Sequence, residues 1–234
     1  MDTERLGAWI DARHLDDAAL AGYRAAFAAD PAKMLMVRDF LRAEVAERLA
    51  GFMAHDADFA TEYGLRSQET GVGAEAWEAA PKDDRFFRFG KLRGIKPEAA
   101  LSDDALSYMR FRTFVTEQPF HDLFEAMTGL PLGASDDFGL HAFRAGDFLD
   151  DHDDANKDRR VALVMYLTPG WQPEFGGALF MEDPGGNVRR FDAGYNSLAV
   201  FDTRAGTTHR VGVVDGDAGD LARHTFGGWF PNPS

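Results

Sequence analysis

The feature that most limits the possible folds of this chain is a series of eight short apolar runs in its C-terminal part. Runs of this length, bounded by Gly, Pro, Asn or Asp, are typical of β-strands. Eight antiparallel strands are the number found in a jelly roll. We therefore predict a double-stranded β-helix (jelly roll), whose strands cover residues 138–143, 148–152, 161–167, 178–181, 188–191, 197–201, 207–213 and 223–230.

The segment before Gly129-Leu130-Pro131 has a different pattern, in which apolar residues recur at helical spacing. A length of 234 residues suits one large domain. We therefore predict an α+β protein with a single domain, 1–234, in which a mainly helical flank (1–130) packs on the jelly-roll core (131–234). The predicted helices cover residues 15–29, 39–53, 102–111 and 119–127.

Composition and charge exclude several functional classes. The formal charge of −14 argues against a nucleic-acid partner, because binding phosphates requires a basic surface. The chain has no cysteine, which excludes disulfide scaffolds, iron–sulfur clusters and thiol catalysis and leaves His, Asp and Glu as metal ligands. Because its first residues are charged and lack an apolar run, we expect no secretory signal, and no run approaches the roughly 20 apolar residues that span a bilayer. We expect a cytoplasmic protein that binds no membrane; the sequence leaves its oligomeric state open.

The acidic stretch Gly146–Asp154 is the strongest candidate for a metal site. His152 and Asp154 are two residues apart, so on an extended strand their side chains share one face. His209, on a later predicted strand, could supply a third ligand. Two imidazoles and one carboxylate form the facial triad of non-haem Fe(II) oxygenases, although a zinc site with these ligands is also chemically possible. A solvated loop or a Ca²⁺ loop is the alternative, but the EF-hand pattern fails because Ala155 occupies the glycine position.

Two further residues indicate a site for a dicarboxylate. Arg223, on the last predicted strand, could hold a carboxylate bidentately, and Tyr166 could donate its hydroxyl to the same group. Taken singly, Arg223 is explained as well by a surface ion pair, and Tyr166 and Trp229 by packing. The combination with the histidines favours a binding role.

These residues occur in an order that resembles the 2-oxoglutarate- and Fe(II)-dependent dioxygenases of the prolyl-4-hydroxylase type. The resemblance covers about residues 138–231, including the spacing of the motifs. The matching motifs are Gly146-Asp147-Phe148-Leu149, His152-x-Asp154, Arg159/Arg160 leading to Tyr166-Leu167, Trp171, Gly176-Gly177-Ala178-Leu179, Asn196–Phe201, His209-x-Val211, Arg223 and Trp229.

The resemblance implies a role for each matching residue. The metal ligands would be His152, Asp154 and His209. Arg223 would bind the distal carboxylate of 2-oxoglutarate, assisted by Tyr166, and Trp229 would line the same pocket. One departure concerns the cosubstrate pocket: many relatives carry a tyrosine where this chain has Phe143, next to His141. The tyrosine hydroxyl is therefore either absent here or replaced by His141.

The implied activity is hydroxylation of an unactivated C–H bond, which consumes O₂ and 2-oxoglutarate and releases succinate and CO₂. The resemblance also admits ascorbate as a reductant. Asp154 favours hydroxylation over halogenation, because it leaves no vacant ligand position for chloride. The first expected substrate is a prolyl residue of a protein or peptide. The alternatives are a free amino acid or small metabolite and, from another class, a non-catalytic jelly-roll module with a structural metal.

Residues 85–93 form a basic and aromatic stretch within this acidic chain. The stretch is either a lid or strand that faces the substrate, or an edge strand whose charges lie in water. General experience with such strands favours the edge strand.

Overall fold

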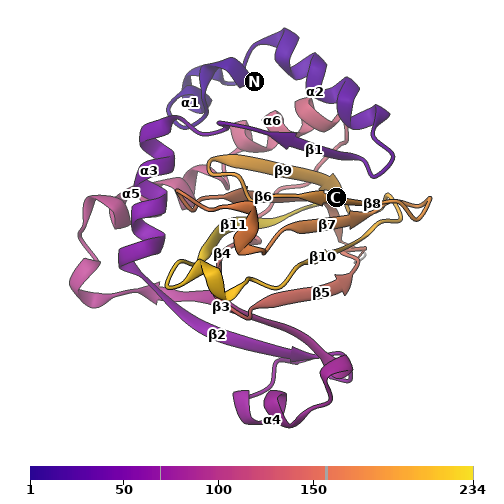
Figure 1. Ribbon diagram of the computed structural model, residues 1–234. Coiled ribbons are helices and arrows are strands. Elements are labelled where there is room, and N and C mark those ends of the chain that lie inside the picture. The colour runs from indigo at the N-terminus through magenta and orange to yellow at the C-terminus, as the bar shows by residue number, and fades with distance from the viewer. Residues whose placement is uncertain (69, 156–157, 234) are drawn as a thin grey trace.

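The computed structural model describes residues 1–68, 70–155 and 158–233. Their strands form one strongly curled antiparallel sheet with the order β1-β9-β6-β11-β4-β3-β5-β10-β7-β8, and β2 pairs with β3 beside this path (Figure 1). The strands are β1 (Met34–Val37), β2 (Ala57–Leu65), β3 (Arg85–Ile95), β4 (Phe138–Phe143), β5 (Phe148–His152), β6 (Arg159–Tyr166), β7 (Leu179–Glu182), β8 (Val188–Phe191), β9 (Ser197–Asp202), β10 (Thr208–Val211) and β11 (Arg223–Pro231).

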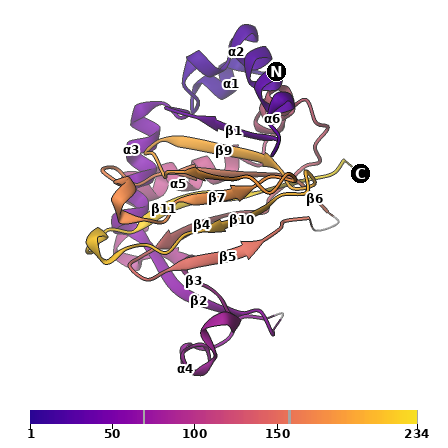
Figure 2. The same ribbon diagram turned by 45° about the vertical axis from the view of Figure 1, so that its right-hand side comes forward.

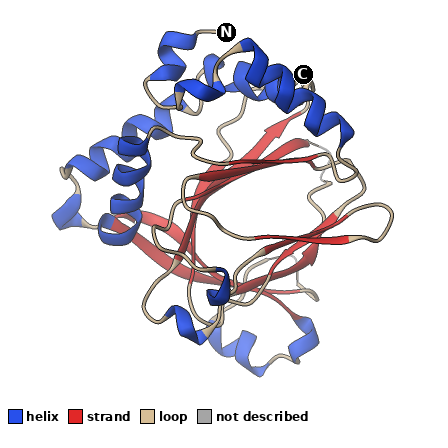
Figure 3. Cartoon of the chain, turned by 45° about the horizontal axis from the view of Figure 1, so that its top comes forward, coloured by secondary structure: helices blue, strands red, loops and turns tan. Residues whose placement is uncertain are grey.

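The curled sheet is the predicted jelly roll. Each of the eight apolar runs predicted as a strand corresponds to one of β4 to β11. Strands β9, β6, β11 and β4 form one layer and β5, β10, β7 and β8 the facing layer, so that the two enclose the interior (Figure 3). The α+β fold class with a jelly-roll core is therefore confirmed.

The N-terminal half contributes three strands, of which β1 and β2 were not predicted from the sequence pattern. β1 pairs with β9, and the helix expected from residue 39 therefore begins only at Ala43, after Asp39 with its positive φ of 49°. β2 and β3 form a long hairpin. β3 contains the stretch 85–93 and pairs with β4 and β5 as well as β2, so the prediction of an edge strand is wrong.

Helices cover the outside of the curled sheet (Figures 1 and 2). Their ends follow ordinary capping chemistry: the Asp16 and Ser102 side chains cap α2 and α5, and Gly129, with φ of 73°, ends α6. Among the described residues, no helix combines the length and the apolarity needed to cross a bilayer. The helices are α1 (Thr3–Gly7), α2 (Asp17–Ala29), α3 (Ala43–Gly51), which continues into a π-helical turn (Phe52–Asp56), α4 (Ala74–Ala79), α5 (Asp103–Phe114) and α6 (Gln118–Thr128).

One face of the sheet packs against the helices and the other lines the interior of the jelly roll, as β11 shows. Phe226 and Phe230 point outward and pack against Phe111 of α5 and Phe124 of α6, with ring centroids 5.2 Å apart in each pair. Fully burying one such ring stabilises the fold by about 1.5–3 kcal/mol. The alternate residues of β11, including Arg223, point into the interior of the jelly roll and line its cavity. The helical face thus supplies the stability that allows the opposite face to carry polar groups.

Candidate active site

His152, Asp154 and His209 meet at one end of the interior. β5 ends at His152, Asp154 follows two residues later, and His209 lies directly opposite His152 in the β5–β10 pairing. One ligand atom from each of the three side chains lies within 4.8 Å of the others. Asp154 and His209 are buried and His152 is partly buried. The three groups are therefore close enough to bind a single metal ion.

The hydrogen bonds of the two imidazoles decide which nitrogens are available. His152 Nδ1 donates to the carbonyl oxygen of Asp150 at 2.9 Å, which leaves Nε2 free for a metal. His209 Nε2 lies 3.5 Å from Asp154 Oδ2, whereas its buried Nδ1 has no hydrogen-bond partner among the described residues. Burial and the neighbouring His209 lower the pKa of His152, so its imidazole is neutral, as metal binding requires.

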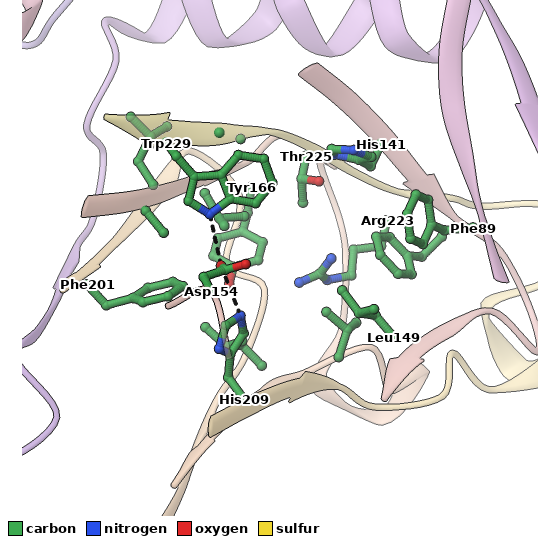
Figure 4. A pocket seen from close by; sticks show the side chains of 18 of the residues that line it. Phe89, His141, Leu149, Asp154, Tyr166, Phe201, His209, Arg223, Thr225 and Trp229 are labelled. Atoms are coloured by element: carbon green, nitrogen blue, oxygen red, sulfur yellow. Dashed lines mark hydrogen bonds and ion pairs between the residues drawn. The ribbon is translucent and has the colours of Figure 1, made fainter. Parts of the chain in front are cut away.

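Asp154 has contacts on both carboxylate oxygens. Oδ1 accepts a hydrogen bond from Arg159 Nη1 at 3.0 Å. Oδ2 accepts one from Trp229 Nε1 at 2.9 Å, as Figure 4 shows. Burial opposes ionisation of Asp154, but the hydrogen bond and charge of His209, together with Trp229, outweigh it and lower the pKa to about 2. The carboxylate is therefore ionised at neutral pH.

A cavity of about 150 Å³ extends from this cluster to Arg223. The Arg223 guanidinium points across the cavity toward Asp154 and His209 (Figure 4). Most of the wall is apolar, which excludes water from the site. The side chains that line it include Phe89, His141, Phe143, Leu149, Val164, Tyr166, Leu179, Phe201, Val211, Thr225 and Trp229.

Arg223 is a buried cation without a carboxylate partner in the described part of the chain. Its exposed fraction is 2%, and its guanidinium carbon lies 5.1 Å from the ring centre of Phe143 and 4.9 Å from that of Tyr166. Burial lowers the pKa of Arg223, and the nearby Tyr166 opposes that change. The Nε of Arg223 and the Tyr166 hydroxyl are buried without a hydrogen bond of normal geometry. An uncompensated buried charge is costly, so this end of the cavity is suited to an anionic ligand.

The position expected to differ from relatives is occupied as the sequence indicates. Phe143 faces Arg223 with its ring and has no hydroxyl to offer. His141, two residues earlier on β4, lies opposite Thr225 of β11, and both line the cavity. Burial, with the charges of Lys91 and Arg223, lowers the pKa of His141 to about 4, so it is a neutral imidazole in the cavity wall.

Three other aspartates of the stretch Gly146–Asp154 are engaged in ion pairs. Asp147 pairs with Arg88 at 2.6 Å, and Asp150 pairs with Arg66 at 2.6 Å. Asp151 lies 3.3 Å from Arg210. These arginines offset the charge beside the three candidate ligands.

Sequence reasoning missed several residues of the site. Thr225 had a usable signal, since it follows Arg223 by two positions on one strand and therefore shares its face. Phe86 and Phe89 come from β3: Phe89 lines the cavity, and the Phe86 ring lies 5.9 Å from that of His152. Arg159 gave no signal that distinguished it from Arg160. Trp229 lines the cavity as expected, but its indole N–H is bonded to Asp154.

The jelly-roll region is similar in sequence to a known family of proteins. Residues 138–231 match the model of the 2OG-Fe(II) oxygenase superfamily. The resemblance to 2OG-Fe(II) oxygenases is confirmed. The chain is 28% identical over 156 residues to prolyl 3-hydroxylase OGFOD1 of Xenopus laevis, which covers 64% of this chain and 29% of that protein. It is 38% identical over 100 residues to prolyl 3-hydroxylase sudestada1 of Drosophila melanogaster, which covers 38% of this chain and 18% of that protein. The chain thus spans less than a third of the length of these relatives.

Two solved structures have the same fold as this chain. A prolyl-4-hydroxylase of Pseudomonas putida superposes with a TM-score of 0.60 at 20% identity, over 92% of this chain and 100% of that one. A prolyl hydroxylase of Trichoplax adhaerens, solved with a hypoxia inducible factor peptide, superposes with a TM-score of 0.62 at 12% identity, over 94% of this chain and 92% of that one. The N-terminal helices and strands are therefore part of a shared architecture.

Proposed function

We propose that this protein is an Fe(II)- and 2-oxoglutarate-dependent dioxygenase that hydroxylates a prolyl residue of a protein or peptide. The observation that supports it best is that the two ends of one cavity carry different chemical groups. Three metal-binding side chains lie within 4.8 Å at one end, and a buried guanidinium without a carboxylate partner lies at the other. A molecule that chelates a metal with one end and carries a carboxylate at the other fits this arrangement.

In this proposal, His152, Asp154 and His209 hold the iron. Iron bound by these residues would supply the redox chemistry that activates O₂ for oxidation of a C–H bond. The protein's own contribution is binding and orientation. His152 is neutral and presents Nε2, and Asp154 is ionised, so these two ligands need no loss of a proton at neutral pH.

Arg223 and Tyr166 hold the distal carboxylate of 2-oxoglutarate. The carboxylate would satisfy the buried Nε of Arg223 and the buried hydroxyl of Tyr166. Because the guanidinium is enclosed between the Phe143 and Tyr166 rings, it cannot follow a misplaced ligand. The distance between Arg223 and the metal cluster thus selects the length of the cosubstrate.

A prolyl substrate is supported by the names of the sequence relatives and by the peptide bound to the Trichoplax structure. A free amino acid or small metabolite is the second candidate, and the mostly apolar lining of the cavity favours it. The relatives are named for position 3 of proline and the Pseudomonas structure for position 4. Amino-acid analysis of the hydrolysed product assigns the position.

The test is anaerobic reconstitution with Fe(II), 2-oxoglutarate and ascorbate, followed by exposure to O₂ and candidate peptides or metabolites. We expect succinate formation and a mass gain of one oxygen in the substrate, and both are lost in His152→Ala. A protein that binds neither Fe(II) nor 2-oxoglutarate would refute the proposal. Metal binding without any turnover of 2-oxoglutarate would instead support a jelly-roll module with a structural metal.

Two broader expectations remain proposals. We propose that the 234 residues unfold as one domain, which a single cooperative transition in urea would support. We also propose a cytoplasmic location, because a reducing compartment keeps iron in the ferrous state. Subcellular fractionation tests this location.

A further inference from the structure

The contacts of Asp154 indicate a role for two residues that are not themselves among the three candidate metal ligands. We propose that Arg159 and Trp229 are positioning residues that together hold the Asp154 carboxylate, so that only Oδ2 faces the metal. This inference rests on the proposed function, since it assumes that Asp154 is a metal ligand. It concerns how the carboxylate is presented, and metal binding alone can test it.

The two carboxylate oxygens have different surroundings. Oδ2 lies 3.5 Å from His209 Nε2, so it is the oxygen on the side of the proposed ligands. Oδ1 accepts a hydrogen bond from Arg159 Nη1 at 3.0 Å. Trp229 Nε1 donates to Oδ2 at 2.9 Å and restricts rotation of the carboxylate. A carboxylate whose Oδ1 is held by a guanidinium coordinates through one oxygen, which keeps the other metal positions available.

Arg159 and Trp229 also fix each other. The guanidinium carbon of Arg159 lies 3.4 Å from the centre of the Trp229 ring. A planar guanidinium can stack on an indole and still direct an N–H in its plane toward Oδ1, which an ammonium group cannot do. The Arg159 side chain is 29% exposed and the Asp154 side chain only 6%. Arg159 therefore closes the solvent side of a carboxylate that is otherwise buried.

An irregularity in the sheet explains why Arg159 has this position and Arg160 does not. In the β6–β11 pairing Trp229 lies opposite Ala162 and Phe230 opposite Val161, but Pro231 lies opposite Arg159. This register shift brings Arg159 to the face of Trp229. Arg160 instead pairs with Asp202 at 3.2 Å. A bulge beside a functional site commonly re-aims one side chain in this way.

The experiment measures binding of Co(II) or Mn(II) to the full chain under anaerobic conditions, by calorimetry and by the visible spectrum of bound Co(II). We expect Arg159→Lys, which keeps the charge, to weaken metal binding by roughly 10- to 100-fold and to change the Co(II) spectrum. Trp229→Phe, which keeps the ring but removes the N–H, should act in the same direction. The loss of metal affinity in the double variant should be smaller than the product of the losses in the two single variants, because the two residues act as a unit.

The control variant is Arg160→Gln, which removes a neighbouring charge from the same strand and should leave metal affinity and spectrum unchanged. Arg159→Gln separates positioning from simple electrostatics. Loss of a nearby positive charge would by itself tighten binding of a dication, whereas loss of positioning weakens it. Tighter binding in Arg159→Gln, or an unchanged Co(II) spectrum in Arg159→Lys, would overturn the proposal.

Circular dichroism and the unfolding midpoint of the metal-free variants show whether they fold. The binding test is also independent of turnover. If the wild-type protein fails to consume 2-oxoglutarate while Arg159→Lys still weakens Co(II) binding, the dioxygenase proposal fails and the positioning proposal stands. If the wild-type protein binds no Co(II) or Mn(II), both fail.

Discussion

His209 lies directly opposite His152 in the β5–β10 pairing, and their ring centroids are 4.1 Å apart. The two imidazoles are thus brought together by strand register alone. Backbone hydrogen bonds of two neighbouring strands set the spacing of these two proposed ligands, so a metal ion would not have to organise them.

The first prediction concerns the metal ligands. Mn(II) at about 100 times its dissociation constant should stabilise the folded protein by about 2.7 kcal/mol, seen as a higher thermal midpoint. His209→Ala and Asp154→Ala should lose this increase, because two ligands hold the ion far less well than three. His55→Ala, at an exposed position, should keep it. A full increase in His209→Ala would contradict the assignment of His209 as a ligand.

The second prediction concerns Arg223 and separates stability from binding. Arg223→Met should raise the dissociation constant for 2-oxoglutarate by about 100-fold or more, because the distal carboxylate loses a buried charged partner. The same change should stabilise the metal-free protein by about 1–4 kcal/mol, since it removes a buried charge that has no carboxylate partner among the described residues. Calorimetry in the presence of Mn(II) and urea unfolding measure the two effects. Weakened Mn(II) binding to the same degree would argue against a cosubstrate role.

The third prediction concerns the hydroxyl of Tyr166, which is buried without a well-formed hydrogen bond. Tyr166→Phe should weaken 2-oxoglutarate binding by about 1 kcal/mol, roughly fivefold, because one hydrogen bond to the carboxylate is lost. The stability of the free protein should stay the same or rise slightly, since no existing bond is broken. A large destabilisation of the free protein, seen in urea unfolding, would show that Tyr166 is a packing residue first.

The fourth prediction concerns pH and His224, whose ring stacks on Phe59 with centroids 5.6 Å apart. Burial, with the charges of Arg144 and His55, lowers the pKa of His224 from 6.5 to about 4. Below pH 6.5 the unfolded chain therefore binds more protons than the folded one. The free energy of unfolding should fall as the pH drops from 6.5 toward 4, by up to about 3 kcal/mol from this residue.

Urea unfolding between pH 7.5 and pH 4.5 measures this dependence. His141, with a pKa of about 4, makes the free energy of unfolding depend on pH in the same direction. His224→Phe should therefore remove only about half of the pH dependence that the two histidines contribute together. Phenylalanine keeps the stack on Phe59 and cannot take up a proton. A slope that is unchanged in His224→Phe would show that His224 is not buried as a neutral group.

The sequence by itself determined the jelly roll and pointed to the residues of its site. The eight C-terminal runs correspond to β4 to β11, because apolar runs and turn residues are properties of a few consecutive residues. The structure also brings His152, Asp154, His209 and Arg223 around one cavity. The sequence predicted that these residues form one site from their order and spacing along the chain.

The tertiary structure alone decided which strands the N-terminal half contributes and which neighbours support the site. β1 and β3 become strands because they pair with β9, β4 and β5, which are distant in sequence. Arg159 reaches Asp154 while the identical neighbour Arg160 does not, because a register shift in the β6–β11 pairing turns one of them inward. Local pattern cannot specify pairing register, since register depends on which strand lies alongside and how its hydrogen bonds align.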